Sequence, residues 1–415
     1  MTEVLDNGLR VLIQENHAAP VVAIQMWVDA GSADDPDRHA GLAHVVEHMV
    51  FKGTARRSEG QIASDVESAG GQINAWTSFD QTVFHVVIAS RFFGNGLEIL
   101  ADALQSPSLD SHDLQRELAV ILEEIKQGED QPGRVVSRNL FAAAYRKHPY
   151  RRSVIGSAGS LQRIRRAPRA VKRFFQRFYV PANMTLVVVG DIRRADALRR
   201  IRKLFDGPTG APRRAARPEE PRQRRLRVSV VERDTSEAYI YMAFHIPGLT
   251  DADTPALDLG AVILGQGESS RLTRRVKHEL QAVTTAHAYS YTPRDPGLLV
   301  LGATAQPGKI AAAIRAMVRE AVALGRSEVT PDELQRAKTI IDSDAVYQKE
   351  TVQGQARKLG FYQTVGGGAG FEQRYNRRIA DVSPTRLREV AARHLKPGNL
   401  TISVVAPSPG EGGVA

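Results

Sequence analysis

The sequence predicts an α+β fold that consists of two homologous domains joined by a linker. Three observations carry this prediction: matching residues at one constant offset, segments whose apolar residues alternate as in strands, and segments with helical spacing. The 415 residues suit two domains of about 200 residues each better than one core. For each domain we expect an α/β sandwich with an antiparallel sheet and helices packed on one face.

The two halves of the chain match one another at an offset of 216 residues. The first half ends with "YVPANMTLVVVGD" and the second with "HLKPGNLTISVVA", so Asn183 corresponds to Asn399 (399 − 183 = 216). Near the start of each half, Ile24 corresponds to Ile240 at the same offset. The other matching pairs are Pro168 and Pro384, Pro181 and Pro397, Thr185 and Thr401, and Met26 and Met242. We infer an internal duplication of one domain.

Composition sets the expected domain boundaries. The segment 206–227 is rich in proline and arginine and has no hydrophobic period, which predicts a linker. We therefore expect the N-terminal domain at 1–205 and the homologous C-terminal domain at 228–407. The last residues, 408–415, are predicted to be a disordered tail.

Strands and helices are predicted from hydrophobic periodicity. The segments "VAIQMWVDA" and "TVFHVVIAS" alternate like half-buried antiparallel strands, whereas "GLAHVVEHMVFK" and "SHDLQRELAVILEEIKQ" have helical spacing. In the second of these helices Ser111 is the expected N-cap. Its apolar stripe comprises Leu114, Leu118, Ile121 and Ile125.

The composition excludes several classes of function. The absence of cysteine excludes disulfides, thiolate metal ligands and a cysteine nucleophile. No run of 18 apolar residues occurs, so we expect no membrane span. The net charge of +10 is not combined with an RNA-binding motif, and we expect an arginine-rich surface and no nucleic-acid partner. The start of the chain lacks a signal-peptide pattern, which leaves the cytoplasm and, if a signal was removed, the bacterial periplasm as alternatives.

The sequence HVVEH at residues 44–48 is a candidate metal motif. On a helix His44 and His48 lie one turn apart on one face, where two imidazoles can bind one tetrahedral zinc ion. Glu47 lies beside His48, and its carboxylate can take a proton from a zinc-bound water. This order is the inverse of HExxH and is typical of inverzincins. The alternative is a pair of ordinary helix histidines, since chance yields such a motif on the order of 0.02 times per chain.

A zinc site requires a third protein ligand, and the second long helix contains three glutamates. Glu117 and Glu124 are two turns apart on one face, whereas Glu123 points about 100° away and is expected to be a surface charge. We predict that Glu124 is the third ligand and that Glu117 orients a ligand. The corresponding positions of the motif in the second half are Gly260, Ile263 and Leu264. The second half therefore repeats the framework without the polar cluster.

The motif "HVVEHMVFKGT", followed by "ELAVILEEIKQGEDQP", resembles the pitrilysin and mitochondrial processing peptidase family of zinc peptidases. The stretches "LDNGLRVLIQE", "AGGQINAWTSFDQTVFH", "HPYRRSVIG" and "YVPANMTLVVVGD" extend the resemblance over nearly the whole first half, and "LGQGESSRL" and "DPGLL" extend it weakly into the second. The resemblance implies that His44, His48 and Glu124 bind one zinc ion, that Glu47 is the general base and that Glu117 supports the site. It also implies that the two domains form half of a clamshell around a closed chamber.

The resemblance also implies a position for the substrate. Substrate peptides of this family add as a strand to the edge strand that carries "NAWTS", a mode that reads mainly the peptide backbone. The residues expected along the peptide are Asn74, Ala75, Trp76 and Thr77. For Trp76, packing in the core is nearly as good an explanation.

The second half departs from the family pattern at two positions. Family members that act as one chain or as homodimers supply an arginine and, seven residues later, a tyrosine that bind the substrate near the scissile carbonyl. These positions are Lys277 and Thr284 here. Lysine lacks the guanidinium fork and threonine lacks a phenol. Because a missing oxyanion donor costs about 10²–10³ in rate, the site is expected to be incomplete in this chain alone.

The expected function is therefore that of a zinc metalloendopeptidase subunit, the catalytic subunit of the bacterial two-subunit type. Its partner in a heterodimer would be a homologous chain that lacks HxxEH and carries the Arg/Tyr pair. One alternative is a self-sufficient homodimer in which Lys277, Tyr289 or Tyr291 serves as the donor. A non-catalytic scaffold subunit is the last alternative, because such subunits usually have a decayed motif.

Overall fold

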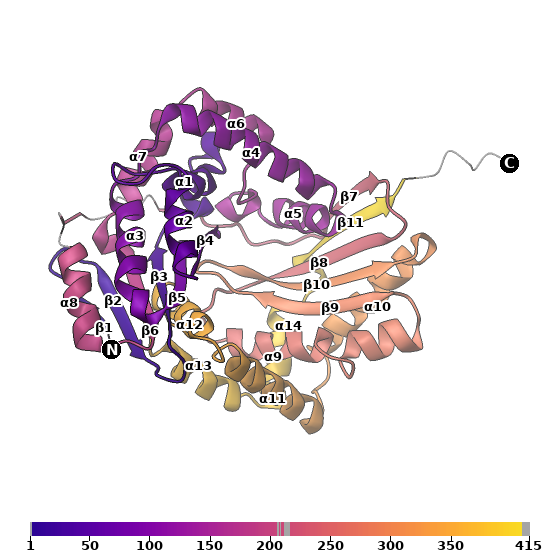
Figure 1. The fold of residues 1–415 in the computed structure, drawn as a ribbon. Coiled ribbons are helices and arrows are strands. Elements are labelled where there is room, and N and C mark those ends of the chain that lie inside the picture. The colour runs from indigo at the N-terminus through magenta and orange to yellow at the C-terminus, as the bar shows by residue number, and fades with distance from the viewer. Residues whose placement is uncertain (1, 206, 208, 211–215, 409–415) are drawn as a thin grey trace. The chain divides into compact units, whose positions relative to one another are not determined.

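The computed structural model describes residues 2–205, 207, 209–210 and 216–408 (Figure 1). The predicted tail lies outside the described residues except for Ser408, as do 206, 208 and 211–215 of the predicted linker. The chain folds into two compact units. Unit 1 comprises Met1–Lys126, Arg152–Arg217 and Val346–Phe371, and unit 2 comprises Gln127–Arg151, Pro218–Ala345 and Glu372–Ala415.

Unit 1 is built on a six-stranded sheet with the order β1-β2-β6-β3-β5-β4. The strands are β1 (Thr2–Val4), β2 (Arg10–Glu15), β3 (Val21–Val28), β4 (Gln72–Thr77), β5 (Thr82–Ala89) and β6 (Met184–Gly190). The helices are α1 (Leu42–Val50), α2 (Gln61–Ser68), α3 (Phe93–Gln105), α4 (Ser111–Glu129), α6 (Ala158–Arg165), α7 (Arg169–Phe178), α8 (Arg194–Leu204) and α12 (Val352–Thr364). Short 3₁₀ turns are η1 (Ser32–Asp34), η2 (Asp37–His39), η3 (Ser90–Phe92) and η5 (Pro181–Asn183).

Unit 2 is built on a five-stranded sheet with the order β7-β11-β8-β10-β9. The strands are β7 (Arg227–Arg233), β8 (Ala238–Ile246), β9 (Thr285–Tyr291), β10 (Gly297–Ala305) and β11 (Leu400–Pro407). The helices are α5 (Pro132–Ala144), α9 (Thr254–Gly265), α10 (Ile310–Ala323), α11 (Pro331–Tyr347), α13 (Phe371–Ala380), α14 (Pro384–His394) and the π-helix η6 (Leu272–Glu279). Short 3₁₀ turns are η4 (Pro149–Arg151), η7 (Pro307–Lys309) and η8 (Pro397–Asn399).

The register of the two sheets confirms the duplication. Ile24 on β3 pairs with Val188 on β6, and Ile240 on β8 pairs with Val404 on β11, so both partners keep the offset of 216 (240 − 24 and 404 − 188). The sheets are mixed and not purely antiparallel as expected, because β2 runs parallel to β6 and β7 runs parallel to β11. A parallel pair requires a long connection, and in each unit most of the helices lie between the two paired strands in the chain.

One asparagine braces each unit in the same way. The Asn183 side chain donates hydrogen bonds to the carbonyl oxygens of Asp29 (3.2 Å) and Phe178 (2.8 Å). The Asn399 side chain donates to the carbonyl oxygens of the residues 216 positions further on, His245 and His394, each at 2.8 Å. The repeated asparagine in the sequence therefore joins the end of a helix to the end of a strand in both units.

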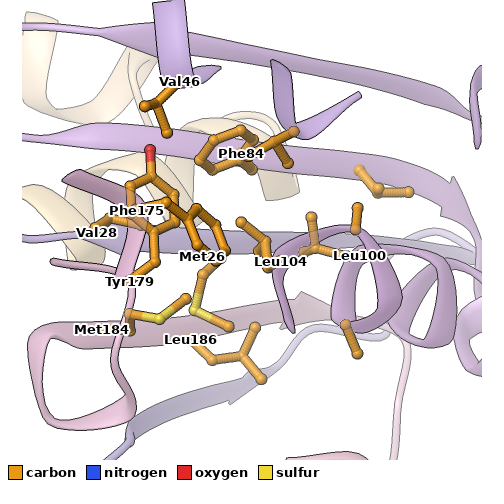
Figure 2. Close-up of a cluster of buried hydrophobic side chains, with 14 of the residues drawn as sticks. Met26, Val28, Val46, Phe84, Leu100, Leu104, Phe175, Tyr179, Met184 and Leu186 are labelled. Atoms are coloured by element: carbon orange, nitrogen blue, oxygen red, sulfur yellow. The ribbon is translucent and has the colours of Figure 1, made fainter. Parts of the chain in front are cut away.

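The core of unit 1 lies between one face of its sheet and helices α1, α3 and α7. Met26 and Val28 from β3 point into it together with Phe84 from β5 (Figure 2). Leu100 from α3 and Phe175 from α7 close the cluster from the helical side. Complete burial of a side chain of this size stabilises the fold by about 1.5–3 kcal/mol, so this face holds the helices in place.

The opposite face of the same sheet is covered as well, which differs from the expected helices on one face. Helix α12 packs on β3 and β6 (Figure 1). Its residue Ala356 joins Trp27 in a second apolar cluster. A Cβ atom on Gly360 would lie 2.1 Å from the Trp27 indole, so glycine permits the close approach. Because both faces are covered, β3 is buried along almost its whole length and is not half-buried.

Unit 2 has the equivalent arrangement with α5. Val135 and Val136 of α5 pack with Val405 of β11 on one face of the five-stranded sheet. Unit 1 thus includes α12 from the predicted C-terminal range 228–407, and unit 2 includes α5 from the predicted N-terminal range 1–205. The two ranges describe the repeats of the sequence, and as domain boundaries they stay a prediction. Within the described residues, no helix is both long enough and apolar enough to cross a membrane.

The N-terminus of α4 differs in one detail from the expectation. Asp110, and not Ser111, caps the helix, because its side chain accepts hydrogen bonds from the backbone N–H groups of His112 (2.7 Å) and Asp113 (3.3 Å). Ser111 is the first residue of the helix. Aspartate and serine are equally good caps, so the sequence alone did not separate the two neighbours.

We expect Asn183→Ala to destabilise unit 1 by about 2–4 kcal/mol, because two carbonyl oxygens lose their donor. Thermal unfolding followed by circular dichroism measures the effect. Asn95→Ala, on the exposed side of α3, is the matched control and is expected to leave the melting temperature nearly unchanged. Equal melting temperatures for Asn183→Ala and the wild type would contradict the role of the brace.

Candidate metal centre

Helix α1 separates apolar from polar residues along its length. Val45, Val46 and Met49 are fully buried in the core of unit 1. His44 and His48 lie four residues apart and therefore on one face of the helix, with side chains 12% and 23% exposed. The apolar residues thus position two imidazoles at the edge of the core.

The start of α1 is anchored by a buried carboxylate. Asp35 accepts hydrogen bonds from the backbone N–H groups of Gly41 (2.7 Å) and Ala43 (2.8 Å). Burial raises the pKa of Asp35 to about 8, against the opposing effects of the two N–H donors and of Arg152. Gly41 has a φ of 94°, and a Cβ there would lie 2.6 Å from the carbonyl oxygen of Ile155. The position of the first residues of α1 is therefore fixed by the close contact at Gly41 and by the two hydrogen bonds to Asp35.

The side chains of His44, His48 and Glu124 converge in the structure. The Glu124 Oε2 atom lies 3.8 Å from His44 Nε2 and 3.9 Å from His48 Nε2, and the three ligand atoms lie within 4.8 Å of one another. Tetrahedral zinc with bonds of 2.0–2.1 Å separates its ligand atoms by about 3.3 Å. The three atoms fit such an ion after small side-chain movements, and they are too far apart to be hydrogen-bonded to one another.

The two histidines differ in how they are oriented. The Nδ1 atom of His48 lies 3.1 Å from Glu117 Oε2, which leaves Nε2 directed toward Glu124. The Nδ1 atom of His44 is buried and has no hydrogen-bond partner among the described residues. Burial, together with the nearby His48, lowers the pKa of His44 to about 3. A neutral imidazole is the form that binds a metal.

Glu47 is held by a hydroxyl group from the edge strand. It is 8% exposed, and its Oε2 atom accepts a hydrogen bond from Thr77 Oγ1 at the end of β4. Burial raises the pKa of the Glu47 carboxyl, while the Thr77 hydrogen bond and the nearby His48 oppose this rise. Glu47 is thus a buried carboxyl group beside the three converging residues.

The residues predicted along the substrate lie on β4, which is the edge strand of the sheet. Asn74 and Ala75 lie in its middle, and the side chain of Thr77 is directed to Glu47. Trp76 packs edge-on against Trp27 with ring centroids 5.7 Å apart, and the Arg357 guanidinium lies 5.3 Å from its ring centroid. Core packing therefore accounts for much of the Trp76 side chain.

Other acidic residues of α4 have separate roles. Glu123 is exposed and pairs with Lys126 at 2.7 Å, in agreement with the predicted surface charge. Asp110, His112 and Asp113 form a second acidic group, but Asp110 already caps the helix and the group is largely exposed.

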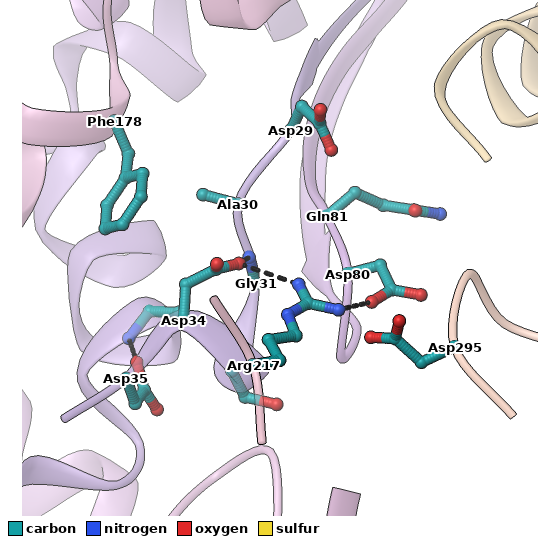
Figure 3. Close-up of polar contacts among 12 residues, drawn as sticks. Asp29, Ala30, Gly31, Asp34, Asp35, Asp80, Gln81, Phe178, Arg217 and Asp295 are labelled. Carbon is teal, nitrogen blue, oxygen red and sulfur yellow. Dashed lines mark hydrogen bonds and ion pairs between the residues drawn. The ribbon is translucent and has the colours of Figure 1, made fainter. Parts of the chain in front are cut away.

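One arginine of the predicted linker, Arg217, has a side chain that is only 14% exposed. Arg217 lies between Asp80 (Nη1 to Oδ1, 2.5 Å) and Asp34 (Nη2 to Oδ2, 3.1 Å), as Figure 3 shows. Asp34 belongs to the loop that leads to α1, and Asp80 belongs to the turn that follows Thr77. Arg217 thus links the loop that leads to α1 with the turn that follows Thr77, whose hydroxyl group binds Glu47. The charge-rich linker composition contained no signal for this single residue.

The two positions that depart from the family pattern lie in unit 2. Lys277 is in the π-helix η6. The Thr284 hydroxyl donates to Glu237 Oε1 at 2.7 Å. Gln281, between them, has a φ of 48°, a left-handed conformation that glycine adopts more readily. The backbone of this segment is therefore unusual at the point where the side chains differ.

Comparisons with known proteins assign the chain to a class of zinc peptidases that share the HxxEH motif order. Residues 10–158 match the family described as "Insulinase (Peptidase family M16)", and residues 168–341 match its "Peptidase M16 inactive domain". The chain belongs to peptidase family M16 and is a metallopeptidase. The second match covers the half that lacks the polar cluster.

The similarity to known proteins extends over nearly the whole chain. A probable mitochondrial-processing peptidase subunit beta of Arabidopsis thaliana is 26% identical over 97% of this chain and 77% of its own length. An uncharacterized zinc protease of Streptomyces coelicolor is 26% identical over 97% of this chain and 88% of its own. A crystal structure of a protease from Helicobacter pylori has a TM-score of 0.91 and 25% identity, over 98% of this chain and 99% of that one. The names support zinc as the metal.

We expect Arg217→Met to destabilise unit 1 by about 3–5 kcal/mol, because two buried carboxylates lose a common countercharge. The melting temperature of the full chain measures this loss, and Arg222→Met, at an exposed linker position, is the control. The double variant Arg217→Met, Asp80→Asn is expected to recover part of the stability. If the double variant melts below the single one, the interpretation as a charge effect is wrong.

Proposed function

We propose that the chain is a zinc metalloendopeptidase subunit that cleaves peptides or unfolded polypeptides inside a closed chamber. In this proposal His44, His48 and Glu124 hold one zinc ion per chain, Glu47 is the general base and Glu117 orients His48. The observation that carries it is the convergence of three ligand atoms within 4.8 Å beside a buried glutamate. A chance pair of helix histidines does not account for Glu124, which comes from a helix about 75 residues further along the chain.

The residues of this chain divide the chemistry among them. A zinc ion bound there supplies a water of lowered pKa and polarises the substrate carbonyl. Glu47 would be the residue that accepts a proton during attack and returns it to the leaving amine. Thr77 holds one Glu47 oxygen, which leaves the other free for the proton. Glu117 accepts the Nδ1–H of His48 and so keeps the Nε2 lone pair available.

The substrate is proposed to bind along β4. An extended peptide can add to the free edge of this strand and pair with its backbone. Asn74, Ala75, Trp76 and Thr77 then lie along the peptide, with the Thr77 hydroxyl already directed to Glu47. Addition of a strand at this edge brings a peptide bond next to the proposed base, which links binding to the chemistry.

We expect Glu47→Gln to bind zinc at one equivalent and to lose activity by about 10²–10⁴-fold, because the amide cannot accept a proton. Glu124→Gln is expected to lose both zinc and activity. Metal analysis after native purification and hydrolysis of a quenched peptide measure the two properties, with Glu123→Gln as the surface control. Activity of Glu47→Gln at the wild-type level would exclude the proposed base.

We further propose that activity requires a homologous partner subunit that supplies an Arg/Tyr pair. The proposal is supported by Lys277 and Thr284 at the two positions where that pair is expected. One relative is named as a subunit, "mitochondrial-processing peptidase subunit beta". The Thr284 hydroxyl is engaged by Glu237, and threonine is too short to replace a phenol at the substrate.

We expect the isolated chain to be about 10²–10³-fold less active than the chain with its partner, since the donor pair is missing. The double variant Lys277→Arg, Thr284→Tyr is expected to raise the activity of the isolated chain, whereas Lys277→Arg, Thr285→Tyr, with the tyrosine shifted by one residue, is the matched control. Hydrolysis of the same quenched peptide measures all of these proteins. Full activity of the isolated wild-type chain would favour the homodimer, and zinc-free protein would favour a scaffold subunit.

A further inference from the structure

The polar groups around the candidate metal centre include a lysine to which neither the motif nor the family match assigns a role. Lys52 follows α1 directly and lies four residues after His48. Its ammonium group lies 2.7 Å from Glu117 Oε1 and 3.2 Å from Glu59 Oε1. The Lys52 side chain is 23% exposed and that of Glu117 is 7% exposed, so the closer of the two ion pairs is largely removed from water.

Glu117 is shared between two partners, one for each oxygen atom. Its Oε2 atom lies 3.1 Å from His48 Nδ1, while its Oε1 atom is bound by Lys52. A buried carboxylate needs a countercharge, and it needs hydrogen bonds to both oxygens to keep one orientation. Lys52 supplies the charge and holds the second oxygen, so that rotation of the carboxylate away from His48 breaks an ion pair.

This orientation decides which nitrogen of His48 is available. An ionised carboxylate can only accept hydrogen bonds, so Nδ1 has to carry the proton that is donated to Glu117. The Nε2 atom then keeps its lone pair, and it is the atom that lies 3.9 Å from Glu124. His44 has no such partner at Nδ1 among the described residues, so His48 is the histidine whose tautomer is controlled.

We propose that Lys52 is a positioning residue that sets the tautomer of His48 through Glu117 and thereby tightens metal binding. The effect on metal affinity rests on the proposed function. The tautomer of His48, in contrast, is a property of the metal-free chain. Lys52 acts through Glu117 and touches no reacting atom. Arg116 pairs at 2.5 Å with Glu59, the second carboxylate that Lys52 contacts.

The test compares Lys52→Met with Arg56→Met in the full chain. Methionine keeps the apolar stem of the lysine and removes its charge. Arg56 is 70% exposed and pairs only loosely with Glu98, at 3.9 Å, so its loss removes the same charge from the same loop without touching Glu117. Lys52→Gln, which keeps a hydrogen-bond donor without the charge, is a second variant in case Lys52→Met does not fold.

Two measurements read out the effect. Competition with a chromophoric chelator gives the zinc affinity, and we expect Lys52→Met to bind about 10–100-fold more weakly while Arg56→Met binds like the wild type. Nitrogen-15 spectra of histidine side chains in the metal-free chain, with His48 assigned by its loss in His48→Gln, report the tautomer. We expect the Nδ1–H form in the wild type and a shift toward the Nε2–H form in Lys52→Met.

A double variant separates a specific effect from general damage. In a Glu117→Gln background, Lys52→Met is expected to cause no further loss of zinc affinity, because the connection to His48 is already broken. An equal loss in both backgrounds, or an unchanged tautomer in Lys52→Met, overturns the proposal. If the wild type binds no zinc, the proposed function fails, and the tautomer of the metal-free chain still decides the role of Lys52.

Discussion

Helix α1 buries one face in an apolar core and presents imidazole and carboxyl groups on the other. The other elements of unit 1 have to supply partners for these polar groups. A polar group at such a boundary is costly unless it is paired. Three groups from separate parts of the chain meet the need: Asp35 at the start of the helix, Thr77 from the edge strand and Glu117 from α4. The core and Asp35 fix where α1 lies, while Thr77 and Glu117 orient the side chains of Glu47 and His48.

Features that depend on local spacing could be predicted from the sequence. The face shared by His44 and His48, and that shared by Glu117 and Glu124, follow from helix geometry alone. The duplication could be predicted because the matching residues of the two halves keep one offset. Asn399 makes in unit 2 the hydrogen bonds that Asn183 makes in unit 1. The family resemblance then supplied roles that geometry alone leaves open.

Features that depend on distant contacts could not be predicted. The alternation in β3 indicated one buried face, but α12 covers the other face, and no local pattern connects Trp27 with Gly360. The hydrogen bond from the Thr77 hydroxyl to Glu47 joins residues 30 positions apart, and no local pattern predicts it. Lys52 and Arg217 looked like two of many basic residues, since the buried carboxylates that they contact become neighbours only in the folded chain.

The contribution of α12 to unit 1 also affects the synthesis of the chain. The last strand of the first sheet ends at Gly190, and α12 begins at Val352, which is 162 residues later (352 − 190). At about 5–20 residues per second, the ribosome needs roughly ten to thirty seconds to make this interval. During that time the Trp27 side of the sheet has no cover from its own helix. An apolar surface that the finished chain buries thus stays uncovered by α12 for much of its synthesis.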